Sequence, residues 1–267
     1  MNEVKLYKGD CLEVMKDIAD KSIDLTVTSP PYDNLRTYNG TCEWNFDIFK
    51  GIAKELYRVT KDGGILVWIV GDATINGSET GTSFKQALYF MDCGFYLHDT
   101  MIWSKPSFTA VGALKTRYAQ TFEYMFVFSK WKIKTFNALR DRKTTSRSKD
   151  KHGMIRQKDG SMRPMSSRGK QYGKFGIRYN VWDMPPVMSN IERTGHPAQF
   201  PEQLANDHII SWSNENDTIF DPFMGSGTTG KMAILNNRNF IGIELNDEYF
   251  AIAEKRVKEA QSQLTLF

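Results

Sequence analysis

The sequence predicts an α/β fold in which a doubly wound, parallel sheet is covered by helices. Two observations predict it. First, apolar strand-like runs alternate along the chain with segments of helical periodicity, and these runs end at proline or glycine. Second, a length of 267 residues suits one large domain, or one domain with an insertion. The composition agrees, because 40% hydrophobic and 25% charged residues are ordinary values for a globular protein with a sizeable core.

The first half of the chain alternates strands and helices. Residues 23–28 form a β-branched run that ends at Ser29-Pro30-Pro31, where two prolines end the ladder of backbone hydrogen bonds. Apolar residues then recur at helical spacing over 46–59, and Asp62-Gly63-Gly64 supplies a turn before the apolar strand 65–70. The next predicted elements are a helix at 84–91 and strands at 97–103 and 123–128.

The alternation stops near residue 130 and resumes near residue 200. The interval 130–195 is polar, basic and punctuated by glycine, which is typical of an insertion. We therefore expect the regions 1–129 and 196–267 to build the sheet domain together, with 130–195 inserted between them. The predicted elements of the last region are helices at 201–212, 228–235 and 249–261 and strands at 218–220 and 240–243.

Positive charge is concentrated in the predicted insertion. The formal net charge is +4, but residues 130–178 hold 16 Lys and Arg against 3 Asp and Glu, which leaves 19 basic and 28 acidic residues elsewhere. A cationic segment on an acidic body can bind a polyanion and release its counterions. A solvated basic loop is the alternative interpretation.

The sequence contains no sign of a membrane segment or of a disulfide framework. No stretch approaches the roughly 20 apolar residues of a membrane span, and the first ten residues contain no apolar run. Cys11, Cys42 and Cys93 form no CxxC pair and have no histidine at metal-ligand spacing, so neither disulfides nor a zinc site is predicted. These observations predict a cytoplasmic protein with reduced thiols.

A glycine-rich turn follows the predicted strand 218–220. Residues 221–230 read DPFMGSGTTG and lead into a helix, so the backbone can approach a ligand closely and the helix amides can face it. The next strand ends at Glu244, 23 residues after Asp221, where nucleoside-binding folds place an acid against ribose hydroxyls. Residues 225–231 also spell GSGTTGK, close to a phosphate-binding loop, but Met232 lacks the hydroxyl that holds magnesium there. The other alternative to a nucleoside-binding turn is that these glycines form a structural turn that binds no ligand.

The stretch Thr28-Ser29-Pro30-Pro31-Tyr32 resembles the catalytic motif of amino-group DNA methyltransferases, which reads Asp, Asn or Ser, then Pro-Pro, then an aromatic residue. With DPFMGSGTT at 221–229 and Glu244, the chain is similar to the β group of that family, which places the catalytic motif first and the cofactor glycines last. The resemblance covers most of the chain outside the basic interval. It implies a Rossmann-like class I methyltransferase sheet, circularly permuted, with 130–195 as a basic target-recognition insertion.

The resemblance implies that S-adenosylmethionine binds at the glycine-rich turn and at two further segments. Gly9-Asp10-Cys11 is similar to the family's adenine-contact segment, and residues 196–201, HPAQFP, are similar to the segment that packs on the methionine end. The implied catalytic residues are Ser29, Pro30, Pro31 and Tyr32. The implied cofactor-binding residues are Asp10, Cys11, Thr28, His196, Pro197, Phe200, Asp221, Pro222, Phe223, Gly225, Ser226, Gly227, Thr228, Thr229 and Glu244.

The chemistry of an exocyclic amine explains this choice of catalytic residues. Its lone pair is delocalised into the ring, and hydrogen bonds to the Ser29 hydroxyl and the Pro30 carbonyl would aim it at the sulfonium methyl for direct in-line transfer. Tyr32 would stack on a base rotated out of the duplex. In the resembling family, serine at the first motif position favours cytosine N4 and aspartate favours adenine N6, so Ser29 favours cytosine, with adenine as the alternative. Methylation at cytosine carbon 5 is disfavoured, because no cysteine follows a proline.

Double-stranded DNA is the partner that the basic insertion favours, with phosphates positioning the protein and a few side chains reading bases. A homodimer and a restriction endonuclease of the same system are compatible further partners. The alternative functions are those of an inactive nucleic-acid-binding homologue and of an RNA or protein methyltransferase.

Two further regions outside the motifs are assigned from the sequence. The loop 77–83 is either a mobile loop over the substrate or a plain surface loop. The candidate DNA-binding residues are Arg142, Lys143, Arg147, Arg163 and Arg168.

Overall fold

The computed structural model describes residues 2–31, 44–106, 116–144, 154–164, 173–187 and 199–264. The chain divides into two compact units, one of Met1–Asn137 with Asn180–Phe267 and one of Ala138–Tyr179. Within the described residues, the larger unit holds the main sheet and all six helices, and the smaller unit holds four short strands.

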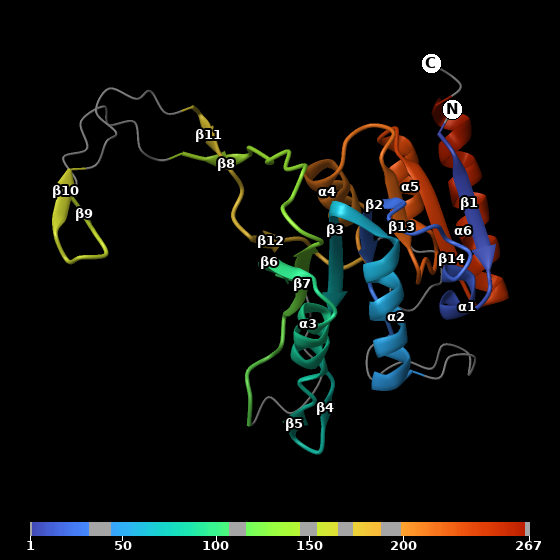
Figure 1. The fold of residues 1–267 in the computed structure, drawn as a ribbon, viewed down its shortest axis with the longest axis horizontal. Helices are drawn as coiled ribbons and strands as arrows, with labels where there is room; N and C mark the ends of the chain where they lie inside the picture. Colours follow the sequence, from blue (N-terminus) through green and yellow to red (C-terminus); the bar gives the residue numbers. More distant parts are fainter. Residues whose placement is uncertain are drawn as a thin grey trace. The chain divides into compact units, whose positions relative to one another are not determined.

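The larger unit is built on an eight-stranded sheet in the order β1-β14-β13-β2-β3-β7-β6-β12 (Figure 1). Neighbouring strands are parallel except where β7 pairs with β3 and with β6. The strands are β1 (Val4–Lys8), β14 (Asn239–Glu244), β13 (Thr218–Asp221), β2 (Ile23–Thr28), β3 (Thr60–Val70), β7 (Phe122–Ser129), β6 (Tyr96–Ser104) and β12 (Val181–Asp183).

The direction of β7 corrects the expectation of a wholly parallel sheet. β6 and β7 follow each other in the chain and pair directly, from Tyr96 opposite Ser129 to Ser104 opposite Phe122. The chain therefore turns back at the end of β6 instead of crossing over the sheet. A strand that is largely buried on both faces has the same apolar pattern in either direction, so the sequence does not reveal this reversal.

Strands from the two ends of the chain lie side by side within the sheet. β13 lies between β14 and β2, and Phe220 is in register with Thr26. Because the two strands are parallel, the chain leaves β2 at Ser29 and leaves β13 after Asp221 at the same edge. This confirms the circularly permuted, Rossmann-like α/β sheet that the sequence predicts.

One face of the sheet is covered by α1 (Cys11–Met15), α2 (Phe46–Val59) and α3 (Thr82–Asp92). The core on this face is aromatic: the Trp68 ring of β3 lies 5.8 Å from that of Phe49 on α2 and 5.0 Å from that of Phe90 on α3. α2 has the 46–59 bounds that its periodicity predicts, and the side chain of Asn45 accepts hydrogen bonds from the amides of Asp47 and Ile48 in the first turn.

The other face is covered by α4 (Glu202–Trp212), with α5 (Thr228–Leu235) and α6 (Asp247–Leu264) beside it. His208 of α4 lies against the sheet, with its Nε2 3.3 Å from the sulfur of Met125 on β7. α5 and α6 pack on each other through Ile234, Val257 and Ala260. The helical segments predicted at 201–212, 228–235 and 249–261 are thus confirmed, to within a few residues at their ends.

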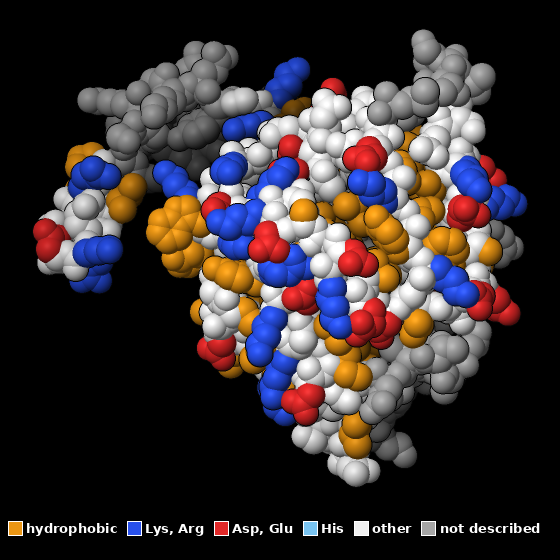
Figure 2. Space-filling model, turned by 45° about the vertical axis from the view of Figure 1, so that its right-hand side comes forward, with side chains coloured by type: hydrophobic (Ala, Val, Ile, Leu, Met, Phe, Trp, Pro, Cys, Tyr) orange, Lys and Arg blue, Asp and Glu red, His pale blue; other side chains and the backbone are white. Residues whose placement is uncertain are grey.

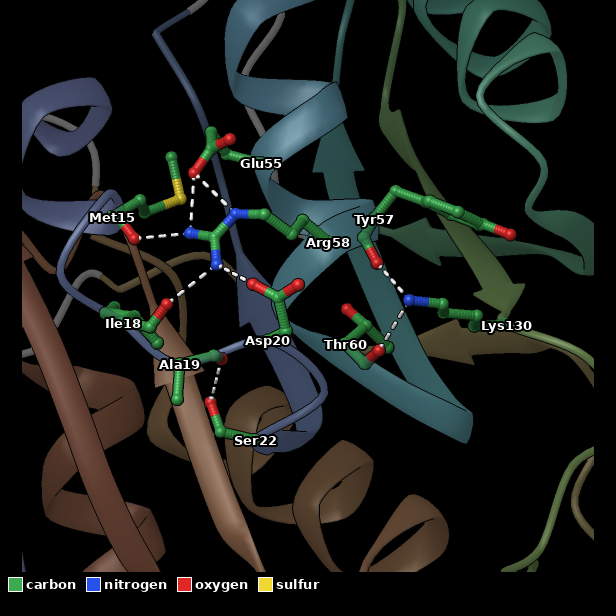
Figure 3. A network of polar contacts seen from close by, with 10 residues as sticks. All are labelled: Met15, Ile18, Ala19, Asp20, Ser22, Glu55, Tyr57, Arg58, Thr60 and Lys130. Carbon is green, nitrogen blue, oxygen red and sulfur yellow. Dashed lines mark hydrogen bonds and ion pairs between the residues drawn. The ribbon is translucent and has the colours of Figure 1, made fainter.

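A polar network fastens the C-terminal end of α2 (Figure 3). The Arg58 guanidinium donates to the carbonyls of Met15 at 2.6 Å and Ile18 at 2.8 Å, and it also pairs with Glu55. The Lys130 ammonium, at the end of β7, donates to the carbonyl of Thr60 at 2.9 Å. Buried backbone carbonyls at a helix end need such partners, so this network fixes α2 against the sheet.

The segment 60–64 differs from the prediction. The turn expected at Asp62-Gly63-Gly64 lies inside β3, which begins at Thr60. Thr60 is opposite Ile23 and Ile65 is opposite Leu25, so the residues between them bulge out of the pairing with β2. Gly63 has φ +85°, a conformation that favours glycine, and its amide bonds to the Lys130 carbonyl.

Short hairpins complete the described structure. β4 (Thr74–Ile75) and β5 (Ser78–Glu79) pair in the larger unit, and β8 (Arg142–Lys143) with β11 (Phe175–Gly176) and β9 (Met154–Arg156) with β10 (Met162–Pro164) pair in the smaller unit. In Figure 2, charged side chains of both signs are interspersed over the visible face of the larger unit. None of the helices in the described part of the chain combines the length and apolar character needed to cross a membrane.

Candidate active site

A cavity lies at the carboxyl edge of the sheet. The ends of four adjacent parallel strands each bring a residue to its lining: Asp10 follows β1, Glu244 ends β14, Pro222 follows β13 and Ser29 follows β2. This edge is where open α/β sheets bind ligands, because the loops that leave parallel strands converge there. The cavity therefore brings together residues from both ends of the chain.

The glycine-rich turn forms one wall of the cavity. Gly225 and Gly227 have φ of +52° and +78°, values that favour glycine. A side chain at Gly227 would also meet the α6 backbone, because a Cβ there would lie 3.0 Å from the Cα of Ala253. α5 begins directly after this turn without a side-chain cap, so its first amides can receive an anionic or polar ligand group.

Glu244 is fixed by backbone amides at the edge of the cavity. One carboxylate oxygen accepts from the Gly225 amide and the other accepts from the Asn246 amide, both at 2.8 Å. Burial raises the pKa of Glu244, and these backbone hydrogen bonds oppose the rise. A carboxylate can accept about four hydrogen bonds, more than these amides supply, so Glu244 can also accept from a ligand hydroxyl.

Asp221 lies behind the cavity wall and is only 2% exposed. Its Oδ1 accepts from the Thr28 hydroxyl at 2.6 Å and from the Phe223 amide at 3.1 Å, which ties the end of β2 to the start of the glycine-rich turn. Burial raises the pKa of Asp221 to about 7, against the lowering effect of its hydrogen bonds from Thr28 and Thr229. Asp221 is thus positioned to hold the turn in shape.

The proline turn reaches the same cavity. Ser29 and Pro31 line it, and Ser29 is half-buried whereas Pro31 is buried. Trp44 also lines the cavity and packs edge-on against Phe223, with ring centroids 5.6 Å apart. Tyr32, the fourth predicted catalytic residue, lies outside the described residues.

The structure divides the predicted cofactor residues into three groups. Thr28, Asp221, Gly227 and Thr229 are not part of the cavity lining, and the first two support it from behind. His196 and Pro197 lie outside the described residues. The cavity is lined by Asp10, Cys11, Phe200, Pro222, Phe223, Gly225, Ser226, Thr228 and Glu244.

Sequence reasoning missed the apolar residues that line the cavity from α2, from the residues just before it and from α6. Trp44, Ile48 and Ile52 line it from α2 and the residues just before it, and Tyr249 lines it from α6. Ile48 and Ile52 are one helical turn apart, which places them on one side of α2. That spacing is a signal for a buried helix face, but it does not distinguish a ligand cavity from a core.

A charged brace behind the glycine-rich turn was also missed. Arg256 of α6 donates to the Ser226 carbonyl at 2.6 Å and pairs with Glu202 of α4 at 2.7 Å. Lys231 of α5 pairs with the same carboxylate at 2.7 Å. The three residues connect α4, α5 and α6 to the turn, and neither Glu202 nor Arg256 belongs to a recognisable motif.

The candidate DNA-binding residues that are described lie in the smaller unit. The Arg142 guanidinium lies over the Tyr179 ring, 4.5 Å from its centroid, and donates to the Ile177 carbonyl at 2.9 Å. Lys143 and Arg163 are exposed. Arg147 and Arg168 lie outside the described residues.

A permuted α/β sheet with a glycine-rich turn, an acid at the end of the next strand and a ligand cavity at the carboxyl edge defines a Rossmann-like fold of the class I methyltransferase type. Residues 23–255 match the family model described as DNA methylase, which covers N6 and N4 amino-methyltransferases. The chain therefore belongs to this family and is a site-specific DNA amino-methyltransferase.

Named relatives support this membership. The chain is 54% identical over 249 residues to the orphan methyltransferase M.BamHII of Bacillus amyloliquefaciens, with 91% of each chain covered. It is 31% identical to the DNA adenine methyltransferase YhdJ of Escherichia coli, over 97% of this chain and 84% of that protein.

Solved structures share the fold. The PvuII DNA methyltransferase, which is cytosine-N4-specific, superimposes with a TM-score of 0.71 over 99% of this chain and 93% of its own, at 22% identity. Other solved structures of this fold hold S-adenosylmethionine.

Proposed function

We propose that this enzyme transfers the methyl group of S-adenosylmethionine to the exocyclic N4 amine of a cytosine that has been flipped out of double-stranded DNA. The observation that carries the proposal is that Ser29 of the proline turn and Glu244 beside the glycine-rich turn line one cavity. A methyl donor held by the glycine-rich turn would thus lie next to the residues that would hold the amine.

The cavity residues fit S-adenosylmethionine. Asp10 and Cys11, with the apolar Ile48 and Ile52, would hold the adenine, and Glu244 would accept hydrogen bonds from the ribose hydroxyls. Phe200 and the free amides at the start of α5 lie where the methionine end would bind. When bound, S-adenosylmethionine supplies an electrophilic methyl group, so no nucleophilic cysteine is needed.

The proline turn would position the target amine. The Ser29 hydroxyl and the Pro30 carbonyl would accept hydrogen bonds from its two N–H groups and aim the nitrogen lone pair at the methyl carbon. Tyr32 would stack on the extruded base. Asp221 acts through Thr28: it fixes the end of β2 against β13 and so positions the residue before Ser29.

Cytosine is the proposed target because serine occupies the first position of the turn. Adenine N6 is the second candidate, and the observation that favours it is the 31% identity to YhdJ, which is named as a DNA adenine methyltransferase. Both amines present the same two N–H donors to the turn, so the surrounding base pocket must distinguish them.

The DNA contacts are assigned to the basic interval 130–195. In the smaller unit, Arg142, Lys143 and Arg163 would contact phosphates or base edges, and Arg147 and Arg168 are proposed with them on sequence grounds alone. We place the enzyme in the cytoplasm, where its DNA is. We also predict, from the sequence alone, that the enzyme can form a homodimer and that a cognate restriction endonuclease can belong to the same system.

Replacing Ser29 tests the catalytic assignment. We expect Ser29→Ala to lower methyl transfer from tritiated S-adenosylmethionine to unmethylated plasmid DNA by about 100-fold or more, because the amine loses one of its two orienting acceptors. Cofactor binding, measured by calorimetry, should persist. The control is Ser262→Ala, an exposed serine on α6. Unchanged turnover in Ser29→Ala would refute the role of this residue.

A further inference from the structure

The β4–β5 hairpin projects from the sheet edge that carries the candidate active site. It begins at Thr74, four residues after β3 ends at Val70, and β3 is the direct neighbour of β2. Thr28 and Trp68 are in register, so the chain leaves both strands at the same edge. Figure 1 shows the hairpin extending beyond α2 and α3 at this edge.

The hairpin has a tight turn and is held from the side. Asn76 and Gly77 have φ of +49° and +81°, as in the two-residue turns that match the twist of a hairpin. Arg117 donates to the Thr74 hydroxyl at 3.0 Å and to the Gly77 carbonyl. One guanidinium therefore joins the first strand of the hairpin to its turn.

The base of the hairpin is fixed by a buried carboxylate. Asp72 is 8% exposed and accepts from the Ser83 amide at 2.9 Å, from the Ser83 hydroxyl, and from the Thr80 hydroxyl at 3.3 Å. The Thr80 amide bonds to the Ala73 carbonyl at 2.9 Å. These contacts join the hairpin to the start of α3 and give it a defined direction.

An apolar side chain is presented at the tip of this rigid element. Ile75, the residue before the Asn76-Gly77 turn, is 54% exposed. It borders a second cavity, whose other walls include Trp44, which also lines the candidate active site, and the exposed Lys85 of α3. An isoleucine held out on a braced hairpin is arranged for contact with another apolar surface.

We propose that the β4–β5 hairpin is the element that enters the DNA stack when the target base is flipped, with Ile75 as the wedge. This inference rests on the proposed function, because a flipped base leaves a gap between two base pairs. An apolar wedge can fill such a gap and offset the lost stacking. Lys85, which is exposed and borders the same cavity as Ile75, can neutralise a flanking phosphate.

The test compares two DNA duplexes with the full-length enzyme. The methylated site is first located by sequencing plasmid DNA that the wild-type enzyme has modified. One duplex carries this site fully paired, and the other carries an abasic position opposite the target base, so that flipping requires no base pair to be broken. The variants are Ile75→Ala and Ile75→Leu, and the control is Leu88→Ala, which removes a leucine that is 62% exposed on α3.

We expect Ile75→Ala to lower methylation of the paired duplex by about tenfold or more and to leave the abasic duplex within about twofold of wild type, because only the paired duplex needs the wedge. Ile75→Leu and Leu88→Ala should behave like the wild type on both. An equal loss on both duplexes, or no loss on either, would overturn the wedge assignment while leaving the proposed function intact. If the wild type methylates no DNA, the proposed function itself fails and this inference with it.

Discussion

The burial of Asp221 makes the free energy of unfolding depend on pH. It is 2% exposed, accepts hydrogen bonds from Thr28 and the Phe223 amide, and has a pKa raised by burial to about 7. Its charge is therefore disfavoured in the folded protein but not in the unfolded chain. Asp221 occupies this unfavourable environment and there joins the end of β2 to the start of the glycine-rich turn.

The pH dependence follows from the sign of this shift. Between about pH 4 and pH 7 the folded state holds a proton on Asp221 that the unfolded state has released, so stability falls as pH rises through this window and levels off above it. The contribution is at most about 4 kcal/mol, from a shift of about three pKa units at 1.36 kcal/mol each. Urea unfolding at pH 5 and pH 8 measures the part of this contribution that is lost above pH 5.

Asp221→Asn keeps the acceptor oxygen but removes the titration. We expect the loss of stability between pH 5 and pH 8 to be smaller in Asp221→Asn than in the wild type. Asp92→Asn, at an exposed carboxylate near the end of α3, serves as the control and should keep the wild-type dependence. The same pH dependence in Asp221→Asn and in the wild type would show that this carboxyl does not titrate as described.

At the scale of elements, two helical glycines have different packing. A Cβ at Gly230 of α5 would lie 2.5 Å from the Phe240 ring of β14, whereas a Cβ at Gly51 of α2 would meet the end of the flexible Leu12 side chain at 3.1 Å. The close approach of α5 to the sheet therefore depends on the absence of a side chain at Gly230, and the packing of α2 depends much less on Gly51.

Alanine at these two positions tests that difference. We expect Gly230→Ala to destabilise the protein by about 1–3 kcal/mol, because the ring and the helix must separate. Gly51→Ala should be near neutral, since a gain in helix propensity of up to about 1 kcal/mol offsets a small shift of Leu12. Equal effects of the two variants on the urea midpoint would contradict this account of α5 packing.

Elements with a strong local signal could be predicted from the sequence. The 46–59 helix has a regular apolar face and a capping Asn45, and it has the predicted bounds. The direction of β7 and the bulge at 61–64 were predicted wrongly because both depend on the partner strand, which local patterns do not report. The glycine-rich turn and Glu244 could be located because their backbone conformation and spacing restrict the residue types. Neither backbone conformation nor motif spacing restricts the residue types at Trp44 and in the Arg256 brace, so the sequence does not mark them as part of the site.

At the scale of the whole molecule, positive charge is uneven along the chain. Residues 130–178 hold 16 of the 35 basic residues and only 3 of the 31 acidic ones. Within the smaller unit, the β9–β10 hairpin carries Arg156 and Arg163 on paired strands, and both are exposed. If these residues contact phosphates, DNA binding must release counterions through them.

The salt dependence of DNA binding tests this role. We expect the double variant Arg156→Gln, Arg163→Gln to bind duplex DNA more weakly and to reduce the slope of log K against log salt by about 0.9 for each phosphate that the protein no longer neutralises. Lys255→Gln with Lys258→Gln, two exposed lysines on α6, is the matched control for net charge. A slope that changes equally in both double variants would point to net charge alone.

The most direct test of the central claim is mass spectrometry of nucleosides from unmethylated DNA that has been treated with the enzyme and S-adenosylmethionine. The account predicts N4-methylcytosine, formed about 100-fold or more slowly when Ser29→Ala replaces the wild-type enzyme. N6-methyladenine in its place would contradict the cytosine assignment, and DNA without any methylated amine would contradict the proposed reaction.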